Sequence, residues 1–348
     1  MPDDGPGRDL ADRADIDLPP IGPTPNARAL RFAKATGVGL LLLVVLAWLN
    51  RGDLPGVRDA IRETPAALGI SAVVHLAQIL ATALAWRSLI GRERRPGISL
   101  MVRLRWYREG FDSLLPAGAL LGQALAARLL MRHRLPARIA AATATVDMTV
   151  EATTQLLFTL AGIGLLLAMR GSHGLADALA ASVALGSLAV ATMVLVQRRL
   201  PLARLRSLLR PLTRRWSAAA IDRIDEVQQA IRQLHTQPRT LLVAALCHTT
   251  SWVLGSLEIA GVLHLLGHDV SLADGVIIES LAQALRTVGF VVPGAVGIQE
   301  GAIIGACALV GVPPEPALVV ALVRRVRGLL FGFPVLLVYR HGERGEIK

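Results

Sequence analysis

Residues 289–301 read GFVVPGAVGIQEG and divide a long apolar stretch, residues 275–312, into two parts. Proline lacks a backbone donor and glycine favours bends, so we expect the helix to break near Pro293 and Gly294. Within a bilayer, a broken backbone is tolerated only where other helices cover it or where it faces water. The stretch therefore predicts a re-entrant hairpin in a membrane-spanning protein.

The composition agrees with a membrane protein. Of the 348 residues, 53% are hydrophobic and 18% charged, and the mean hydropathy is +0.51, whereas soluble domains contain about a quarter charged residues. This excludes a disordered chain. The two cysteines, Cys247 and Cys307, lie in apolar runs and match no metal or redox spacing, so we expect them to be packing residues. The net charge of +11 comes from basic groups between apolar segments, which argues against a nucleic-acid-binding face.

Apolar runs and loop charges together predict the topology. Residues 91–108 carry six arginines against Glu93, and residues 198–239 carry ten arginines against three acids. Such loops lie in the cytoplasm under the positive-inside rule, which also places both termini there. We expect an all-α, multi-pass protein of about six crossings and two re-entrant hairpins. The crossings are residues 35–49, 65–90, 139–169, 175–196, 241–266 and 315–339, and the hairpins are residues 111–130 and 275–312.

Two segments lie outside these crossings. Residues 1–27 are rich in proline and aspartate and predict a disordered tail, followed by a single membrane domain, residues 28–348. Residues 198–239 separate repeat one, about 91–196, from repeat two, about 241–340. Leucine and isoleucine spacing within 198–239 predicts two amphipathic helices, 202–212 and 221–234, along the membrane surface. A solvated loop helix is the alternative.

The two halves align when the sequence is shifted by 177 residues. The shift places Pro116 on Pro293, Pro136 on Pro313, Ala140 on Ala317, Ala144 on Ala321 and Val146 on Val323. Loop charges give the two halves opposite orientations, so we expect an inverted repeat, which many transporters build around a midplane substrate site. Chance alignment of alanine-rich helices remains the alternative.

Ionisable residues fall within both aligned crossings. Asp147 and Glu151 lie one turn apart in the first, and Arg324, Arg325 and Arg327 occupy the second. Because each buried charge costs about 2.5–3.5 kcal/mol, we expect the acids of one half to face the arginines of the other in a polar core. This core is either a structural ion-pair network or a site for a phosphate or carboxylate, which the guanidinium fork matches.

These segments resemble a known family. GFVVPGAVGIQEG at 289–301 and ALVRRVRG at 321–328 resemble the transmembrane region of lysylphosphatidylglycerol synthases and their flippase-like relatives. In the first half, LLPAG at 114–118, Gly122-Gln123, ARLL at 127–130 and VDMTVE at 146–151 resemble the hopanoid-biosynthesis-associated branch. The likeness spans about residues 30–340. One departure is Leu121-Gly122-Gln123, where a glycine pair followed by an acid is expected.

The resemblance implies a bacterial inner-membrane protein that binds or flips a membrane lipid with an anionic or polar headgroup, such as a hopanoid-related lipid. Because the sequence ends at Lys348, we expect no soluble aminoacyl-transferase domain, and we expect no enzyme activity, cofactor, metal or nucleic-acid partner. One alternative is a scaffold that recruits lipid-biosynthesis enzymes through residues 198–239. Another, an integral-membrane transferase, has no visible nucleophile or metal set.

The hairpin tips and one further carboxylate complete the candidate site. Gln299 and Glu300 follow the second bend, where they either cap the next helix or orient a headgroup. Glu258 is the candidate for proton coupling, while His75, Gln78 and His248 are expected to form interhelical hydrogen bonds. The residues assigned to the tips are Pro116, Gly118, Gln123, Pro293, Gly294, Gly297, Gln299, Glu300 and Gly301.

Overall fold

A computed structural model describes residues 54–114, 118–170, 218–288 and 297–345, with isolated helical residues between 184 and 197. These parts of the chain are helical and contain no strand, which confirms the predicted all-α class. The predictions for the tail, for the crossing 35–49 and for the first amphipathic helix lie outside the described residues, as do Pro116, Pro293 and Gly294.

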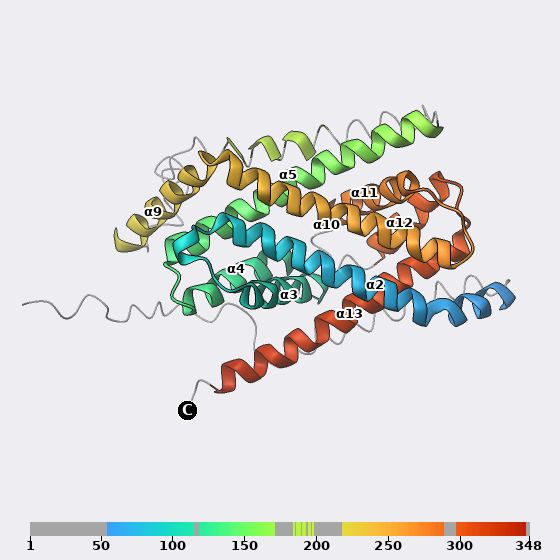
Figure 1. The fold of residues 1–348 in the computed structure, drawn as a ribbon, viewed down its shortest axis with the longest axis horizontal. Coiled ribbons are helices and arrows are strands. Elements are labelled where there is room, and N and C mark those ends of the chain that lie inside the picture. The colour runs from blue at the N-terminus through green and yellow to red at the C-terminus, as the bar shows by residue number, and fades with distance from the viewer. Residues whose placement is uncertain are drawn as a thin grey trace, which may run out of the picture.

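The described elements form a bundle with one long axis (Figure 1). The elements are α2 (Leu54–Leu89), the 3-10 turn η2 (Arg92–Arg94), α3 (Ile98–Leu114), α4 (Gly118–Arg132), α5 (Ala137–Arg170), α9 (Ala218–His235), α10 (Pro238–Leu265), α11 (Leu272–Val288), α12 (Ile298–Leu309) and α13 (Pro314–Gly345).

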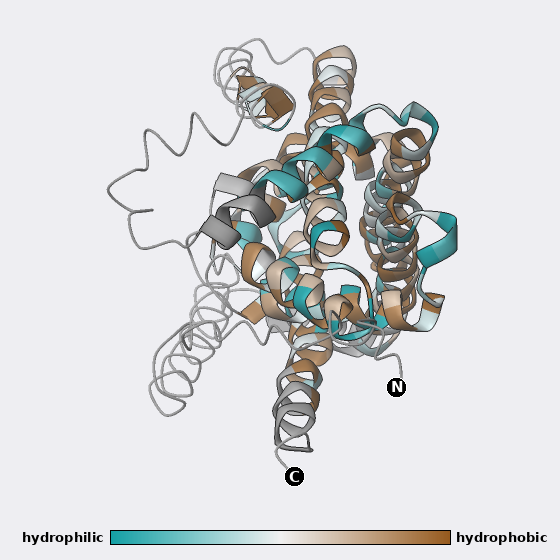
Figure 2. Cartoon of the chain, turned by 90° about the vertical axis from the view of Figure 1, so that its left-hand side faces the viewer, coloured by the Kyte–Doolittle hydropathy of each residue, from teal (hydrophilic) through white to brown (hydrophobic). Residues whose placement is uncertain are grey.

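Three helices among the described residues are long and apolar enough to cross a bilayer. They are Pro65–Leu89, Ala137–Met169 and Pro238–Leu265, of 25, 33 and 28 residues, and about 20 apolar residues span the hydrocarbon core. Figure 2 shows brown, hydrophobic residues along much of the described bundle. Large apolar side chains face outward from α2 and α10, among them Val73, Leu76, Leu242 and Leu246. The protein is therefore membrane-embedded.

Loops of like charge gather at the same end of the bundle. The α2–α3 loop, the α4–α5 loop and α9 lie at the left in Figure 1, whereas the α10–α11 and α12–α13 loops lie at the right. The left-hand loops carry Arg92, Arg94 and Arg134, and the α10–α11 loop carries Asp269. The grouping of loops inferred from the positive-inside rule thus agrees with the arrangement of the helices.

One arginine-rich stretch is only partly a loop. Residues 91–108 are predicted to lie in the cytoplasm from their six arginines, but residues 98–108 belong to α3, where Arg105 and Arg108 are buried. Counting arginines does not reveal their partners: both residues pair with Glu151, and Arg105 also pairs with Asp147, acids that lie more than forty residues away in the sequence.

Both interrupted apolar stretches consist of two helices. α3 ends at Leu114 and α4 begins at Gly118, while α11 ends at Val288 and α12 follows Gly297, whose φ of 80° favours glycine. A Cβ at Gly118 would lie 2.1 Å from the carbonyl oxygen of Phe111, so glycine allows α4 to pack closely on α3. Gln123 donates to the carbonyl of Ala144 at 3.1 Å and joins α4 to α5.

The same order of elements occurs twice. A long helix, an interrupted pair and another long helix form α2–α5, and the order recurs in α10–α13. A shift of 177 residues places Ala137, which begins α5, on Pro314, which begins α13. α5 packs on α11 and α13 packs on α3, so each half ends against the interrupted pair of the other. Among the residues aligned from sequence, the alanines and valines are all buried: Ala140, Ala144, Val146, Ala317, Ala321 and Val323.

The second amphipathic helix is present as α9, but its apolar face meets the protein. Ile231 and Leu234 pack in one cluster with Leu89 of α2, Val146 of α5 and Ala244 of α10. Asp225, Glu226 and Arg232 are exposed. Ile231 and Leu234 therefore pack against neighbouring helices and not against the membrane surface.

Two glycines of α5 provide a test of the contact between the halves. A Cβ at Gly162 would lie 2.6 Å from Cβ of Ser280 on α11, whereas a Cβ at Gly164 would have no neighbour within 4 Å. We expect Gly162→Ala to lower the free energy of unfolding by about 1–3 kcal/mol through overpacking. Gly164→Ala should leave it unchanged or raise it by up to about 1 kcal/mol. Thermal unfolding in detergent measures both, and equal effects would contradict this packing.

Candidate functional site: a charged cavity between the two halves

A polar cavity of about 90 Å³ lies where the two halves meet. This volume is well above the ~10–15 Å³ that one water needs, so the cavity can hold water beside charged groups. Residues of α2, α3, α5, α10, α11 and α13 line it. The charged lining residues are Arg105, Arg108, Arg286, Arg324 and Arg327 with Glu109, Asp112, Glu151 and Glu279.

The first charge cluster joins α3 to α5. Arg105 contacts Glu109 at 3.2 Å, Asp147 at 3.3 Å and Glu151 at 2.9 Å. Arg108 lies 2.7 Å from the second oxygen of Glu151. Asp147 is fully buried and so needs these partners, since an unpaired buried carboxylate is costly.

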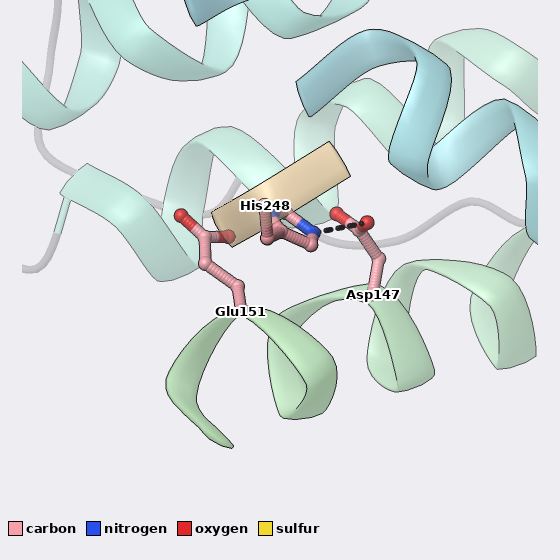
Figure 3. A group of neighbouring side chains, drawn as sticks. All are labelled: Asp147, Glu151 and His248. Atoms are coloured by element: carbon pink, nitrogen blue, oxygen red, sulfur yellow. Dashed lines mark hydrogen bonds and ion pairs between the residues drawn. The ribbon is translucent and has the colours of Figure 1, made fainter. Parts of the chain in front are cut away.

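His248 of α10 completes the first cluster. Its Nε2 lies 3.0 Å from Oδ1 of Asp147, and both side chains are fully buried (Figure 3). The same carboxylate therefore binds Arg105 through one oxygen and His248 through the other. The expected interhelical role of His248 is confirmed, and Gln78 has a similar one, donating to the carbonyl of Ser251 at 3.0 Å.

The second cluster joins α13 to α11 and α10. Arg324 contacts Glu279 at 2.5 Å and Glu258 at 3.4 Å, and it also donates to the carbonyl of Gly255 at 3.0 Å. Arg327 donates to Glu258, which also accepts from Ser71 of α2 at 2.6 Å. Glu258, the candidate for proton coupling, is therefore engaged by two arginines and a hydroxyl.

One residue of each cluster is related to the other by the internal alignment, and the two have opposite charges. Asp147 and Arg324 occupy equivalent positions. Asp147 contacts Arg105 on the first arm of its own interrupted pair, and Arg324 contacts Glu279 on the first arm of its own pair. Each also contacts α10, Asp147 through His248 and Arg324 through Glu258.

The expected partners of the buried charges are corrected by these contacts. Asp147 and Glu151 pair with arginines of their own half, and do not form an ion pair with Arg324 or Arg327 in the described part of the chain. Glu151 nevertheless lines the same cavity as both of those arginines. The reason is local: the arm that precedes each long helix already supplies opposite charges within reach.

Arg325 points elsewhere. It donates through Nε to Glu300 at 2.6 Å, and the other oxygen of Glu300 accepts from the backbone N–H of Gly297 at 2.8 Å. Glu300 therefore caps α12, as one of the two interpretations of this residue required. Gln299 is half-buried at the same helix start, and Gly301 is exposed. Arg325 and the described tip residues lie outside the lining of the cavity.

Sequence reasoning missed several charged residues of the cavity. Arg105 and Arg108 were counted as loop charges, although their spacing places them on one helix face. Glu279 lies in the apolar stretch 275–288, where a carboxylate is itself a signal of function or pairing. Asp112 and Arg286, which form an ion pair between α3 and α11, could not be matched without the fold.

Asp147, Glu151 and His248 offer ligand atoms that lie within 4.8 Å of one another, as a metal site would require. Figure 3 shows the two carboxylates on adjacent turns of α5 with the imidazole between them. However, Arg105 and Arg108 already bind these carboxylates and supply the positive charge that a cation would bring. The group is therefore better suited to an ion-pair network than to a divalent ion.

One of the comparisons with known proteins identifies a family. A family described as the lysylphosphatidylglycerol synthase TM region matches residues 34–335. The chain belongs to this family. Both charge clusters and both interrupted pairs lie within the matched residues. No curated protein and no solved structure matched the chain.

Two arginines of α3 test the role of the first cluster. Arg105 is 1% exposed and contacts three carboxylates, whereas Arg103 is exposed on the same helix. Replacing Arg105 with alanine removes the buried guanidinium that Asp147 and Glu151 share, so we expect a loss of about 3–5 kcal/mol in the free energy of unfolding. Arg103→Ala should change it by less than about 0.5 kcal/mol. Thermal unfolding in detergent provides the comparison; a small effect at Arg105 would show that the cluster does not stabilise the bundle.

Proposed function

We propose that this protein binds the headgroup of an amphiphilic lipid in the charged cavity and moves it across the bacterial inner membrane. The observation that carries the proposal is the cavity itself: five arginines and four carboxylates meet inside an apolar bundle. Ionisable groups at this depth commonly mark a substrate or ion pathway. Membership of the family supports a lipid-related role.

The chemistry of the lining fits a headgroup. A guanidinium presents paired donors that match the oxygens of phosphate or carboxylate. Water in the cavity would be replaced by the headgroup, while the acyl or polycyclic part stays in the surrounding bilayer. With five arginines against four carboxylates, the lining has an excess of positive charge that suits an anionic headgroup, and we propose transport without catalysis, cofactor or metal.

The internal symmetry supports alternating access. We infer an inverted repeat of about six crossings and two re-entrant hairpins, with both termini in the cytoplasm. The recurring element order, the shift of 177 residues that relates α5 to α13, and the grouping of loops by charge support this inference. In such a plan, rocking of one half against the other opens a central site to each side in turn.

The test is leaflet exchange in reconstituted vesicles. Purified protein is inserted into liposomes that contain, in separate preparations, labelled phosphatidylglycerol, phosphatidylethanolamine, a prenyl phosphate or a hopanoid. We expect at least one lipid to exchange faster than in protein-free vesicles, because the cavity shelters its headgroup from hydrocarbon. Replacing cavity-lining Arg327 with glutamine should slow this exchange at least tenfold, while the exposed Arg103→Gln should not. No exchange of any lipid by folded protein would refute the proposal.

A scaffold for lipid-biosynthesis enzymes is the second candidate, because α9 presents an exposed polar face that includes Asp225, Glu226 and Arg232. Deleting the whole segment would also remove Ile231 and Leu234 from the core. Reversing the three exposed charges is the cleaner test. Loss of cellular function with normal leaflet exchange would favour the scaffold. If both cellular function and leaflet exchange are retained, the carrier is favoured.

A further inference from the structure

One ion pair that lines the cavity joins the two halves directly. Arg286 of α11 donates to Asp112 of α3. Each residue lies two positions before the end of its helix, at Val288 and Leu114, so the pair connects the inner ends of both interrupted segments. Both residues line the cavity.

This pair is the most exposed of those formed by the cavity arginines within the described residues. The side chains of Arg286 and Asp112 are 28% and 26% exposed. The side chains of the other four cavity arginines are between 1% and 12% exposed: Arg105, Arg108, Arg324 and Arg327. Exposed pairs contribute about 0–1 kcal/mol, whereas breaking a buried pair costs about 3–5 kcal/mol. Arg286 can therefore change partner at the lowest cost.

The other arginines are also more firmly tied. Arg105 holds three carboxylates, Arg324 holds two carboxylates and a carbonyl, and Arg108 and Arg327 each contact a carboxylate that a second arginine also binds. Withdrawing Arg105 or Arg324 to a ligand would remove a cation that several carboxylates share, and withdrawing Arg108 or Arg327 would remove one of the two arginines on a largely buried carboxylate. Releasing Asp112 would leave a carboxylate that is already partly exposed.

We propose that Arg286 is the exchangeable anion-binding residue of the cavity, and that the phosphate of a lipid headgroup displaces Asp112 from it. This rests on the proposed function of the cavity. Phosphate and carboxylate oxygens accept the same paired hydrogen bonds from a guanidinium, so one can replace the other. The exchange also separates α3 from α11 at this contact, which couples headgroup binding to loosening of the two halves.

The two partners should then respond in opposite directions. Asp112→Asn removes the competing charge and should tighten anion binding about two- to fivefold, as expected from the value of a partly exposed pair. Arg286→Gln removes the binding group and should weaken it about ten- to a hundredfold. The exposed Arg103→Gln is the control and should leave it unchanged. The double swap D112R/R286D keeps one guanidinium and one carboxylate at the contact and should restore binding to within about fivefold.

The measurement is binding to purified, detergent-solubilised protein, followed by native mass spectrometry and thermal shift. The probes are short-chain phosphatidylglycerol, glycerol phosphate and inorganic phosphate. We expect the opposite shifts with phosphatidylglycerol; shifts with inorganic phosphate alone would identify a free anion as the ligand and overturn the lipid assignment. Weakening by both single variants, or no change in either, would show a structural ion pair.

These outcomes are distinct from failure of the proposed function. Wild-type protein that exchanges lipid between leaflets while Asp112→Asn and Arg286→Gln behave alike would refute the exchange at Arg286 alone. Folded wild-type protein that neither binds nor exchanges any lipid would refute both. Thermal unfolding of each variant confirms folding, and the double swap retains the test if a single variant fails to fold.

Discussion

Mutual neutralisation of guanidinium and carboxylate groups inside an apolar bundle is the constraint on which this structure depends. Each charge would cost about 2.5–3.5 kcal/mol or more in the bilayer interior if it stood alone. The contacts of Arg105 and Arg324 meet this cost by holding acids from neighbouring helices. Because a shift of one turn would separate these atoms, the pairs also fix the register of α3 against α5 and of α11 against α13.

The central helix α10 links the two charge clusters. His248 contacts Asp147 in the first cluster, and Glu258 contacts Arg324 and Arg327 in the second. α2 packs along α10 and adds the hydroxyl of Ser71 to Glu258. A movement that alters one cluster must therefore either move α10 or break a contact with it, and this gives the two halves a physical route of communication.

The sequence could predict the elements of this fold better than the pairing of its charges. Proline and glycine mark the interrupted stretches, and long apolar runs mark the crossings, because these features act locally. Asp147 and Arg324 were visible as charges inside apolar helices. Their partners were not, because Arg105 and Glu279 lie more than forty residues from them in the sequence, and composition places an arginine equally well in a loop or in an ion pair. For the same reason, the sequence could not predict that the apolar side chains of α9 pack against α2, α5 and α10.

Asp147 in one half is aligned with Arg324 in the other, and the two walls of the cavity differ in charge accordingly. The acids of α5 and Glu279 of α11 lie on helices that pack together, and the buried arginines of α3 and α13 lie on the other packed pair. Four ion pairs run from one wall to the other: Arg105 pairs with Asp147 and Glu151, Arg108 with Glu151, and Arg324 with Glu279. Asp112 and Arg286 reverse this pattern, since an acid projects from the arginine-rich wall and an arginine from the acidic one. Any separation of the walls must break this contact, and its partial exposure makes it the least costly to break of the pairs between the walls.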